Sequence, residues 1–356
     1  MIFDIISKIP SVCESLKSEA LPIFLYGMGN GAEKIYAYLC RNGIEISGVV
    51  ASDGFVRGQS FLGHEVVSIS EAEEKHGRLC LVICFGTEGE KSRFLKELAK
   101  KHRIVSPNLP VFGEGACDKE YILANADRFE RVYGILEDEQ SRSLLLSLLK
   151  YNASGDISYL EINNGLVPPK DFYSHKMRHI DIGAYDGDTV NEFIGYNDEY
   201  SDIIAFEPDK ATYKKLLKNT TGLRGVKCIN GAAGRKNGKI GFSSGGGRAS
   251  HCGEGEDAEC YSVDEYCGYT HIAANGTTVG SIKIDAEGMD EAVICGAVNT
   301  IYCCKPSICV ALYHRAYDII DIPLLLRMHN RKYKFYLRKK EYIPAWDIFL
   351  YVTEGK

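Results

Sequence analysis

The sequence has no long hydrophobic run. Nowhere in its 356 residues does an apolar stretch reach the ~20 residues that a helix needs to cross a bilayer. The first residues also lack the charged start and apolar segment of a secretory signal peptide. We therefore expect no membrane span and a cytoplasmic location.

A strong charge of one sign is also missing. The 42 Lys and Arg residues nearly balance the 48 Asp and Glu residues, and the net charge is only −6 at pH 7. Such a chain has no general attraction for nucleic acid or for an anionic membrane surface. We expect no nucleic-acid partner.

The 13 cysteines include no Cys-x-x-Cys pair, and their number is odd. Many lie inside apolar runs, which is typical of buried reduced thiols and not of a disulfide framework. Without such a pair a structural zinc site is not expected, and we predict no bound metal. The composition, with 45% hydrophobic and 25% charged residues, is that of a globular chain long enough for two domains.

The chain is organised around residues 178–209. Residues 178–182 form a short run with β-branched residues, which predicts a buried parallel strand. Gly183, Ala184 and Gly187 follow, and they let the backbone turn tightly and approach a ligand. Thr189 suits the start of a helix. The pattern predicts a strand, a glycine turn and a helix.

A second apolar run, residues 202–206, ends in Glu207-Pro208-Asp209. In an open parallel sheet, ligands bind beyond the carboxyl ends of the strands. An acidic residue at this point can accept both hydroxyl groups of a ribose. Residues 203–209 therefore predict a nucleoside site beside the glycine turn.

The glycine turn itself carries the acids Asp181, Asp186 and Asp188. A pyrophosphate would require backbone amides there and no negative charge. An acidic turn suits a nucleoside with a cationic centre, such as the sulfonium of S-adenosyl-L-methionine (SAM). An ordinary strand–turn–helix unit without a ligand is the alternative, because a single glycine loop is a weak signal.

Polar residues also end the later predicted strands. Residues 226–230 lead into Gly231 and Ala232, residues 281–285 end in Asp285 close to Glu287, and residues 307–313 lead into His314. Small residues after the first of these strands would let an adenine ring lie against the backbone. The carboxylates and the histidine would face the same cleft.

A second glycine turn lies near the N-terminus, after a predicted strand at residues 23–26. An acid follows about 20 residues later, as in dinucleotide-binding folds. This pattern defines an uncertain second nucleotide site, for a nucleotide, nucleotide-sugar or dinucleotide, whose residues are Gly27, Gly29, Asn30, Gly31 and Asp53. A glycine turn that merely joins a strand to a helix is the alternative.

We predict three regions. Residues 1–115 form a Rossmann-like domain of the nucleotide-binding type. Residues 116–171 form a helical connector, with one helix at 127–151, and a short flap. Residues 172–356 form a second Rossmann-like domain whose mostly parallel sheet has an antiparallel finish at 333–338 and 348–352.

The third region, residues 172–356, resembles the FkbM family of SAM-dependent methyltransferases. The resemblance covers nearly all of residues 172–356 and rests on the segments HIDIGAYDGDTV, IIAFEPD, SIKIDAEGMDEAVICGA and WDIFLYV. Where the family usually has Ile-Asp-Val-Glu-Gly, this chain has an alanine between Asp285 and Glu287. The resemblance implies a class I methyltransferase fold and transfer of a methyl group from SAM to a hydroxyl oxygen. It further implies that the acceptor is a sugar, glycan or natural product.

The turn and the resemblance together assign a set of residues to SAM. They are Asp181, Gly183, Ala184, Tyr185, Asp186, Gly187, Thr189, Glu207, Pro208, Asp209, Gly231, Ala232 and Asp285. The candidate catalytic bases are Asp285, Glu287 and His314, although the two acids could instead bind a divalent metal. We expect a small-molecule or glycan acceptor, and leave open whether the chain forms a homo-oligomer.

Two other classes of function remain. One is an NAD(P)-dependent oxidoreductase that uses the N-terminal glycine loop, although no Tyr-x-x-x-Lys couple is found near it. The other is a non-catalytic protein that binds SAM or a nucleotide-sugar and transfers no methyl group.

Overall fold

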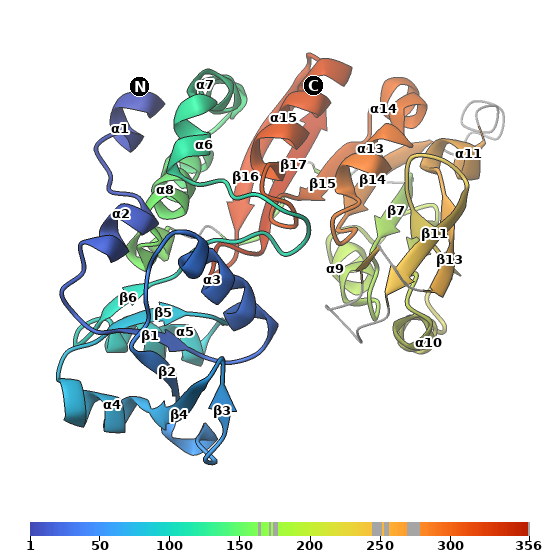
Figure 1. Cartoon of the computed structure of the whole chain (residues 1–356). Coiled ribbons are helices and arrows are strands. Elements are labelled where there is room, and N and C mark those ends of the chain that lie inside the picture. The colour runs from blue at the N-terminus through green and yellow to red at the C-terminus, as the bar shows by residue number, and fades with distance from the viewer. Residues whose placement is uncertain are drawn as a thin grey trace.

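The computed structural model describes residues 1–162, 165–170, 172–173, 177–243, 251–252, 256–268 and 278–354. Two sheets dominate it, with helices around and between them (Figure 1). The sheet formed by the N-terminal part lies apart from the sheet of the C-terminal part, and α6, α7 and α8 lie above the first sheet in this view. No described helix is both long and apolar enough to cross a membrane.

The first sheet has the strand order β3-β4-β2-β1-β5-β6, and its strands are parallel except for β3. Its strands are β1 (Ile23–Tyr26), β2 (Gly48–Ala51), β3 (Ser60–Phe61), β4 (His64–Ser68), β5 (Cys80–Ile83) and β6 (Arg103–Val105). The helices between these strands are η1 (Asp53–Phe55), α3 (Asn30–Arg41), α4 (Ile69–His76) and α5 (Glu90–Leu98).

Strand β1 is buried on both faces, and its side chains alternate between two apolar cores. Leu25 belongs to the core that includes Leu39 of α3. Phe24 and Tyr26 belong to a larger core that includes Phe129 of the helical layer. Covering both faces is what a parallel sheet requires.

The helical layer connects the two sheets. It consists of α1 (Ile2–Ile6), α2 (Val12–Lys17), α6 (Lys119–Ala124), α7 (Ala126–Ile135), α8 (Glu139–Ser154) and η2 (Ile157–Glu161). The single helix predicted for residues 127–151 is wrong. Leu136 leaves the helix with an extended backbone and forms a bridge to Phe335, and the Asp138 side chain caps α8 through Ser141 N (2.7 Å).

The second sheet has the order β16-β17-β15-β14-β7-β8-β9. Its strands are β7 (Arg178–Ile182), β8 (Ile203–Phe206), β9 (Val226–Ile229), β14 (Val279–Ile284), β15 (Ser307–Ala311), β16 (Tyr333–Lys339) and β17 (Ile348–Glu354). The strands from β9 to β15 are parallel to one another. Strand β17 pairs in the antiparallel direction with both of its neighbours, β15 and β16. The predicted α/β class, with a mostly parallel sheet and an antiparallel finish, is confirmed.

Helices and a small sheet surround this second sheet. The helices are α9 (Asp188–Tyr196), α10 (Lys210–Asn219), α11 (Val263–Cys267), α13 (Asp290–Cys295), α14 (Val298–Cys304) and α15 (Asp318–His329). The small sheet has the order β10-β13-β11-β12, with bounds β10 (Ala232–Ala233), β11 (Gly238–Ser243), β12 (His251–Cys252) and β13 (Glu256–Tyr261).

The turn between β16 and β17 reaches the first sheet. Thr87, beyond the end of β5, exchanges two backbone hydrogen bonds with Ile343 of this turn, of 2.7 and 2.9 Å. An alanine at Gly86 would collide with the ring of Trp346, because a Cβ atom there would stand 2.7 Å from it. The two halves of the chain are therefore packed against each other at the carboxyl end of β5.

Candidate active site

A cavity of ≈ 130 Å³ lies at the carboxyl ends of β7, β8 and β14 in the second sheet. Because β7 lies between β14 and β8 while preceding both in the sequence, this is a point where the strand order reverses. The glycine turn, the acid after β8 and the loop after β14 all contribute to the wall. The cavity is lined by Ile182, Gly183, Tyr185, Asp188, Thr189, Phe206, Glu207, Pro208, Gly231, Ala232, Ala233, Lys283, Asp285, Ala286, Glu287, Met289, Tyr313 and Asp347.

Glycine is required at position 183. Its φ of +72° is in the left-handed region, and a Cβ atom there would stand 1.9 Å from the carbonyl oxygen of Asp285. The turn after β7 therefore touches the backbone that follows β14. This close approach fixes the floor of the cavity.

Glu207 closes one side of the cavity and is only 7% exposed. Its carboxylate accepts hydrogen bonds from the backbone N–H groups of Tyr185 (3.1 Å) and Asp209 (2.8 Å). Burial raises the pKa of Glu207 to about 7, although these two hydrogen bonds lower it. The side chain is held in place as an acceptor at the end of β8.

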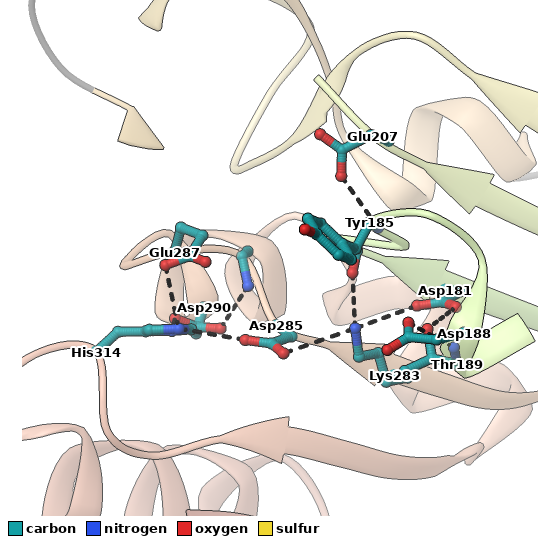
Figure 2. A network of polar contacts seen from close by, with 12 residues as sticks. Asp181, Tyr185, Asp188, Thr189, Glu207, Lys283, Asp285, Glu287, Asp290 and His314 are labelled. Atoms are coloured by element: carbon teal, nitrogen blue, oxygen red, sulfur yellow. Dashed lines mark hydrogen bonds and ion pairs between the residues drawn. The ribbon is translucent and has the colours of Figure 1, made fainter. Parts of the chain in front are cut away.

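Lys283 joins two carboxylates under the cavity (Figure 2). Its ammonium nitrogen donates to the carbonyl oxygen of Gly183 (2.7 Å) and lies 3.4 Å from Asp181 and 3.8 Å from Asp285. Burial acts to lower the pKa of Lys283, but the two carboxylates outweigh burial and raise it. Lys283 is thus a fixed positive charge between Asp181 and Asp285.

His314 is completely buried among three acids that follow β14 (Figure 2). Its Nδ1 atom lies 2.7 Å from Asp290, and its Nε2 atom lies 3.2 Å from Asp285 and 3.5 Å from Glu287. Burial acts to lower the pKa of His314, but Asp290 and Asp285 outweigh it and raise the pKa well above the usual value. The imidazole is therefore a cation at neutral pH and cannot accept a proton.

The two acids beside His314 differ in basicity. Burial acts to raise the pKa of Asp285, but Lys283 and His314 outweigh it and hold the pKa well below its usual range. Burial raises the pKa of Glu287 to about 7, against the smaller opposing effect of His314. Glu287 can therefore exchange a proton at neutral pH, as can Glu207 at the end of β8, whereas Asp285 stays ionised.

Two residues of the cavity wall have unusual backbone conformations. Tyr185 and Glu287 both have a φ of +47°, although neither is glycine. Such conformations cost of order 1–3 kcal/mol each and persist where the surrounding structure enforces them. Asp290 enforces the conformation of Glu287. Its carboxylate accepts hydrogen bonds from the backbone N–H groups of Ala286 (2.9 Å) and Gly288 (3.3 Å), on either side of Glu287.

Comparison with known protein families identifies this part of the chain. Residues 181–335 match the family model described as the methyltransferase FkbM domain. Residues 181–335 carry an FkbM methyltransferase domain. The resemblance seen in the sequence is confirmed over these residues, and methyl transfer is the activity of the family.

A solved structure shares the fold. The methyltransferase FkbM from Methylobacillus flagellatus KT aligns with 99% of this chain and 97% of its own chain, at 17% identity and a TM-score of 0.70. An rRNA methylase from Streptococcus thermophilus (9% identity, 52% of this chain and 91% of that one, TM-score 0.33) also matches. So does fibrillarin from Aeropyrum pernix with natively bound S-adenosyl-L-methionine (11% identity, 51% of this chain and 67% of that one, TM-score 0.31). No curated protein matches the chain.

Eight of the residues assigned to SAM line the cavity of the FkbM domain: Gly183, Tyr185, Thr189, Glu207, Pro208, Gly231, Ala232 and Asp285. Their role in SAM binding stays a prediction. Five others do not line it: Asp181, Ala184, Asp186, Gly187 and Asp209.

The five residues outside the cavity wall have other contacts or conformations. Asp181 is buried beneath the wall and accepts a hydrogen bond from the hydroxyl of Thr189 (2.6 Å). Ala184 is buried in the core, and Asp209 caps α10. Gly187 has a φ of +93° and directly precedes α9. The carbonyl oxygen of Asp186 accepts a hydrogen bond from the side-chain amide of Asn219 (2.8 Å).

Of the three candidate bases, Asp285 and Glu287 line the cavity and His314 does not. His314 lies behind the two acids. Asp290, Tyr313 and Asp347 were not predicted as site residues. Tyr313 is the last residue of a predicted strand, Asp290 follows another by a few residues, and Asp347 precedes the antiparallel strand at 348–352, so strand ends are the signal that could have found them.

The predicted second nucleotide site is only partly assembled. Asn30 and Gly31 line a different cavity, of ≈ 530 Å³, whereas Gly27, Gly29 and Asp53 do not. Asp53 does not line this cavity, and it accepts a hydrogen bond from the hydroxyl of Ser70 (2.9 Å).

Proposed function

We propose that the chain is a SAM-dependent O-methyltransferase that acts on a hydroxyl group of a sugar, glycan or natural product. One observation supports this most. A single cavity at the strand ends of the FkbM domain has the buried acceptor Glu207 on one side and Glu287, with a pKa near neutrality, on another.

The residues present fit SAM. When bound, SAM supplies an electrophilic methyl group on a positively charged sulfur. The cavity wall is rich in carboxylates, which favour a cation: Asp188, Glu207, Asp285, Glu287 and Asp347. Glu207 is placed to accept ribose hydroxyl groups, and Gly231 and Ala232 leave room for a flat ring. A Cβ atom at Gly231 would stand 2.6 Å from the ring of Tyr261, so no larger residue fits there.

The cavity is expected to hold the acceptor hydroxyl next to the methyl group and to take its proton. Holding the two reactants in line can supply ~7–11 kcal/mol of the acceleration in favourable cases. A sugar hydroxyl is a weak nucleophile, so a positioned base adds roughly 10²–10⁴-fold. Glu287 is our candidate for this base, because its pKa of about 7 matches neutral pH and its side chain reaches the cavity.

The other charged groups position Glu287 and the substrate. Asp285 stays ionised between Lys283 and His314 and can accept a hydrogen bond from the substrate. Tyr313 donates a hydrogen bond of 3.3 Å to Asp285 from the same wall. His314 and Asp290 hold the two acids from behind, out of contact with the cavity.

Calorimetry with SAM and with its demethylated product, S-adenosylhomocysteine (SAH), tests cofactor binding. We expect both to bind, and the substitution Glu207→Ala to weaken both at least tenfold because it removes the ribose acceptor. Glu199→Ala is the matched control, since Glu199 is exposed and lies outside the cavity. If wild-type protein binds neither compound, the proposal is wrong.

The acceptor class is tested by initial rates of SAH formation with a panel of sugars, glycans and hydroxylated natural products. Mass spectrometry of the product then locates the new methyl group. A methyl group on nitrogen or carbon would contradict O-methylation while leaving SAM binding intact.

A further inference from the structure

The larger cavity, of ≈ 530 Å³, lies between the two halves of the chain and outside the site described above. One wall comes from the first sheet, with the start of α3 and the segments after β5 and β6. The opposite wall comes from the FkbM part, with Arg315, Pro344 and Trp346. A cavity built from both halves exists only when they are packed as they are here.

The charge of this cavity is opposite to that of the methyl-transfer site. Lys34 and Arg315 line it, and no carboxylate does among the residues that the structure describes. In addition, α3 begins at Asn30 after Gly29, with no side-chain cap on its first turn, so its backbone N–H groups add positive potential. The cavity therefore suits an anion.

An unused donor also belongs to this wall. The indole Nε1 atom of Trp346 is buried and has no hydrogen-bond partner in the described residues. A buried donor without a partner costs free energy, and this one lies behind the face of the ring that lines the cavity, so the proposal does not depend on it. The remaining wall is apolar, with Ile35, Leu109 and Phe112 among its residues, so the occupant needs an apolar or flat part as well as its charge.

We propose that this cavity binds a phosphate-bearing small molecule, such as a nucleotide or a sugar phosphate. Its phosphate lies near the start of α3, Lys34 and Arg315, and its organic part lies against Leu109 and Trp346. Asp53 has no part in this site, so binding does not follow the dinucleotide pattern that the sequence suggested.

Residues that line the two cavities lie next to one another in the sequence, and we expect this to couple the two sites. Tyr313 and Asp347 line the methyl-transfer site, whereas Arg315 and Trp346 line the second cavity. Arg315 also donates to the carbonyl oxygen of Gly288 (2.6 Å), the residue after Glu287.

A second contact follows the same path. The backbone N–H of Phe112 donates to the carbonyl oxygen of His314 (2.9 Å). Lys34 in turn donates to the carbonyl oxygen of Val111 (3.0 Å). An anion that draws Lys34 or Arg315 toward itself therefore acts on the segment that carries Glu287 and on the backbone at His314.

Binding is tested by calorimetry of the full chain with pyrophosphate, ADP, UDP and glucose 1-phosphate, which separate the contribution of the phosphates from that of the base or sugar. We expect at least one to bind, more weakly at higher salt. Asn30→Asp should weaken binding at least tenfold, because it places a negative charge beside the phosphate. The same substitution favours the helix, since an acid in the first turn is stabilising, so the variant should keep its thermal midpoint.

Arg41→Gln is the matched control. Arg41 is exposed near the end of α3, outside the cavity, and its loss removes one positive charge from the same helix. It should change the affinity less than twofold, whereas Lys34→Gln should lower it severalfold. The proposal is overturned if none of the four probes binds wild-type protein, or if Arg41→Gln weakens binding as much as Asn30→Asp does.

The coupling is tested by titrating SAH with and without a saturating amount of the probe that binds. We expect the affinity for SAH to change at least threefold in wild-type protein, and not in Asn30→Asp at the same probe concentration. An SAH affinity that ignores the probe would overturn the coupling. Failure of SAH to bind at all would instead count against the proposed function.

Discussion

Substitution of Glu287 by glutamine is the sharpest test of the chemistry. The change keeps the size and polarity of the side chain and removes its ability to take a proton. If Glu287 is the base, kcat should fall by roughly 10²–10⁴-fold. At 1.36 kcal/mol per factor of ten, this corresponds to about 2.7–5.4 kcal/mol of activation free energy.

The pH dependence of kcat tests the role of Glu287 independently. Burial raises the pKa of Glu287 to about 7. Because the base must be deprotonated to act, kcat of the wild type should rise about tenfold per pH unit below this value and level off above it. In Glu287→Gln this inflection should disappear. A value of kcat that falls as pH rises through 7 would have the wrong sign for a base.

The assay is the initial rate of SAH formation between pH 5.5 and 9, with an acceptor that the wild type methylates. Glu291→Gln is the matched control, because Glu291 is an exposed acid on the first turn of α13 and does not line the cavity. It should keep nearly full activity. The reasoning is refuted if Glu287→Gln keeps more than a tenth of kcat, or keeps the inflection near pH 7.

Three further substitutions test the surroundings of the site. Gly183→Ala should abolish SAH binding in calorimetry, because its Cβ atom would stand 1.9 Å from the carbonyl oxygen of Asp285; binding within twofold of wild type would contradict this. Asp264→Ala should lower the free energy of unfolding in urea by about 1–3 kcal/mol, since this buried carboxylate accepts hydrogen bonds from N–H groups at the start of α14; an unchanged midpoint would count against it. Asp290→Asn should lower the pKa of His314, visible in ¹⁵N NMR of the imidazole, and an imidazole that stays charged to the same pH would show that Asp285 alone suffices.

Much of the second sheet could be predicted from the sequence. The predicted strand at residues 178–182 agrees with β7, because a short run with β-branched residues is a strong local signal. Each predicted strand also ended next to polar residues, and parallel strands bring such ends to one edge. This is why Glu207, Asp285 and Glu287 could be placed in one cavity before their distances were known.

Other parts of the fold depend on contacts that no local pattern reveals. The edge strand β3 and its neighbour β4 were not predicted, since β3 has two residues and β4 is only partly buried. The break between α7 and α8 was missed because residues 127–151 keep an apolar stripe, while the break is fixed by the bridge from Leu136 to Phe335 far along the chain. The far wall of the second cavity was missed for the same reason, because Arg315 and Trp346 belong to the other half.

The role of His314 shows where sequence reasoning about the site reaches its limit. A histidine after a buried strand is a reasonable base, since its ordinary pKa lies near neutrality. Whether it is charged depends on the balance between burial, which favours the neutral ring, and nearby acids, which favour the cation. Asp290 at 2.7 Å and Asp285 at 3.2 Å decide that balance for the cation, and they leave Glu287, at 3.5 Å, as the weaker acid of the group. The sequence supplies all four residues, but our choice of Glu287 as the proposed base follows only from these distances.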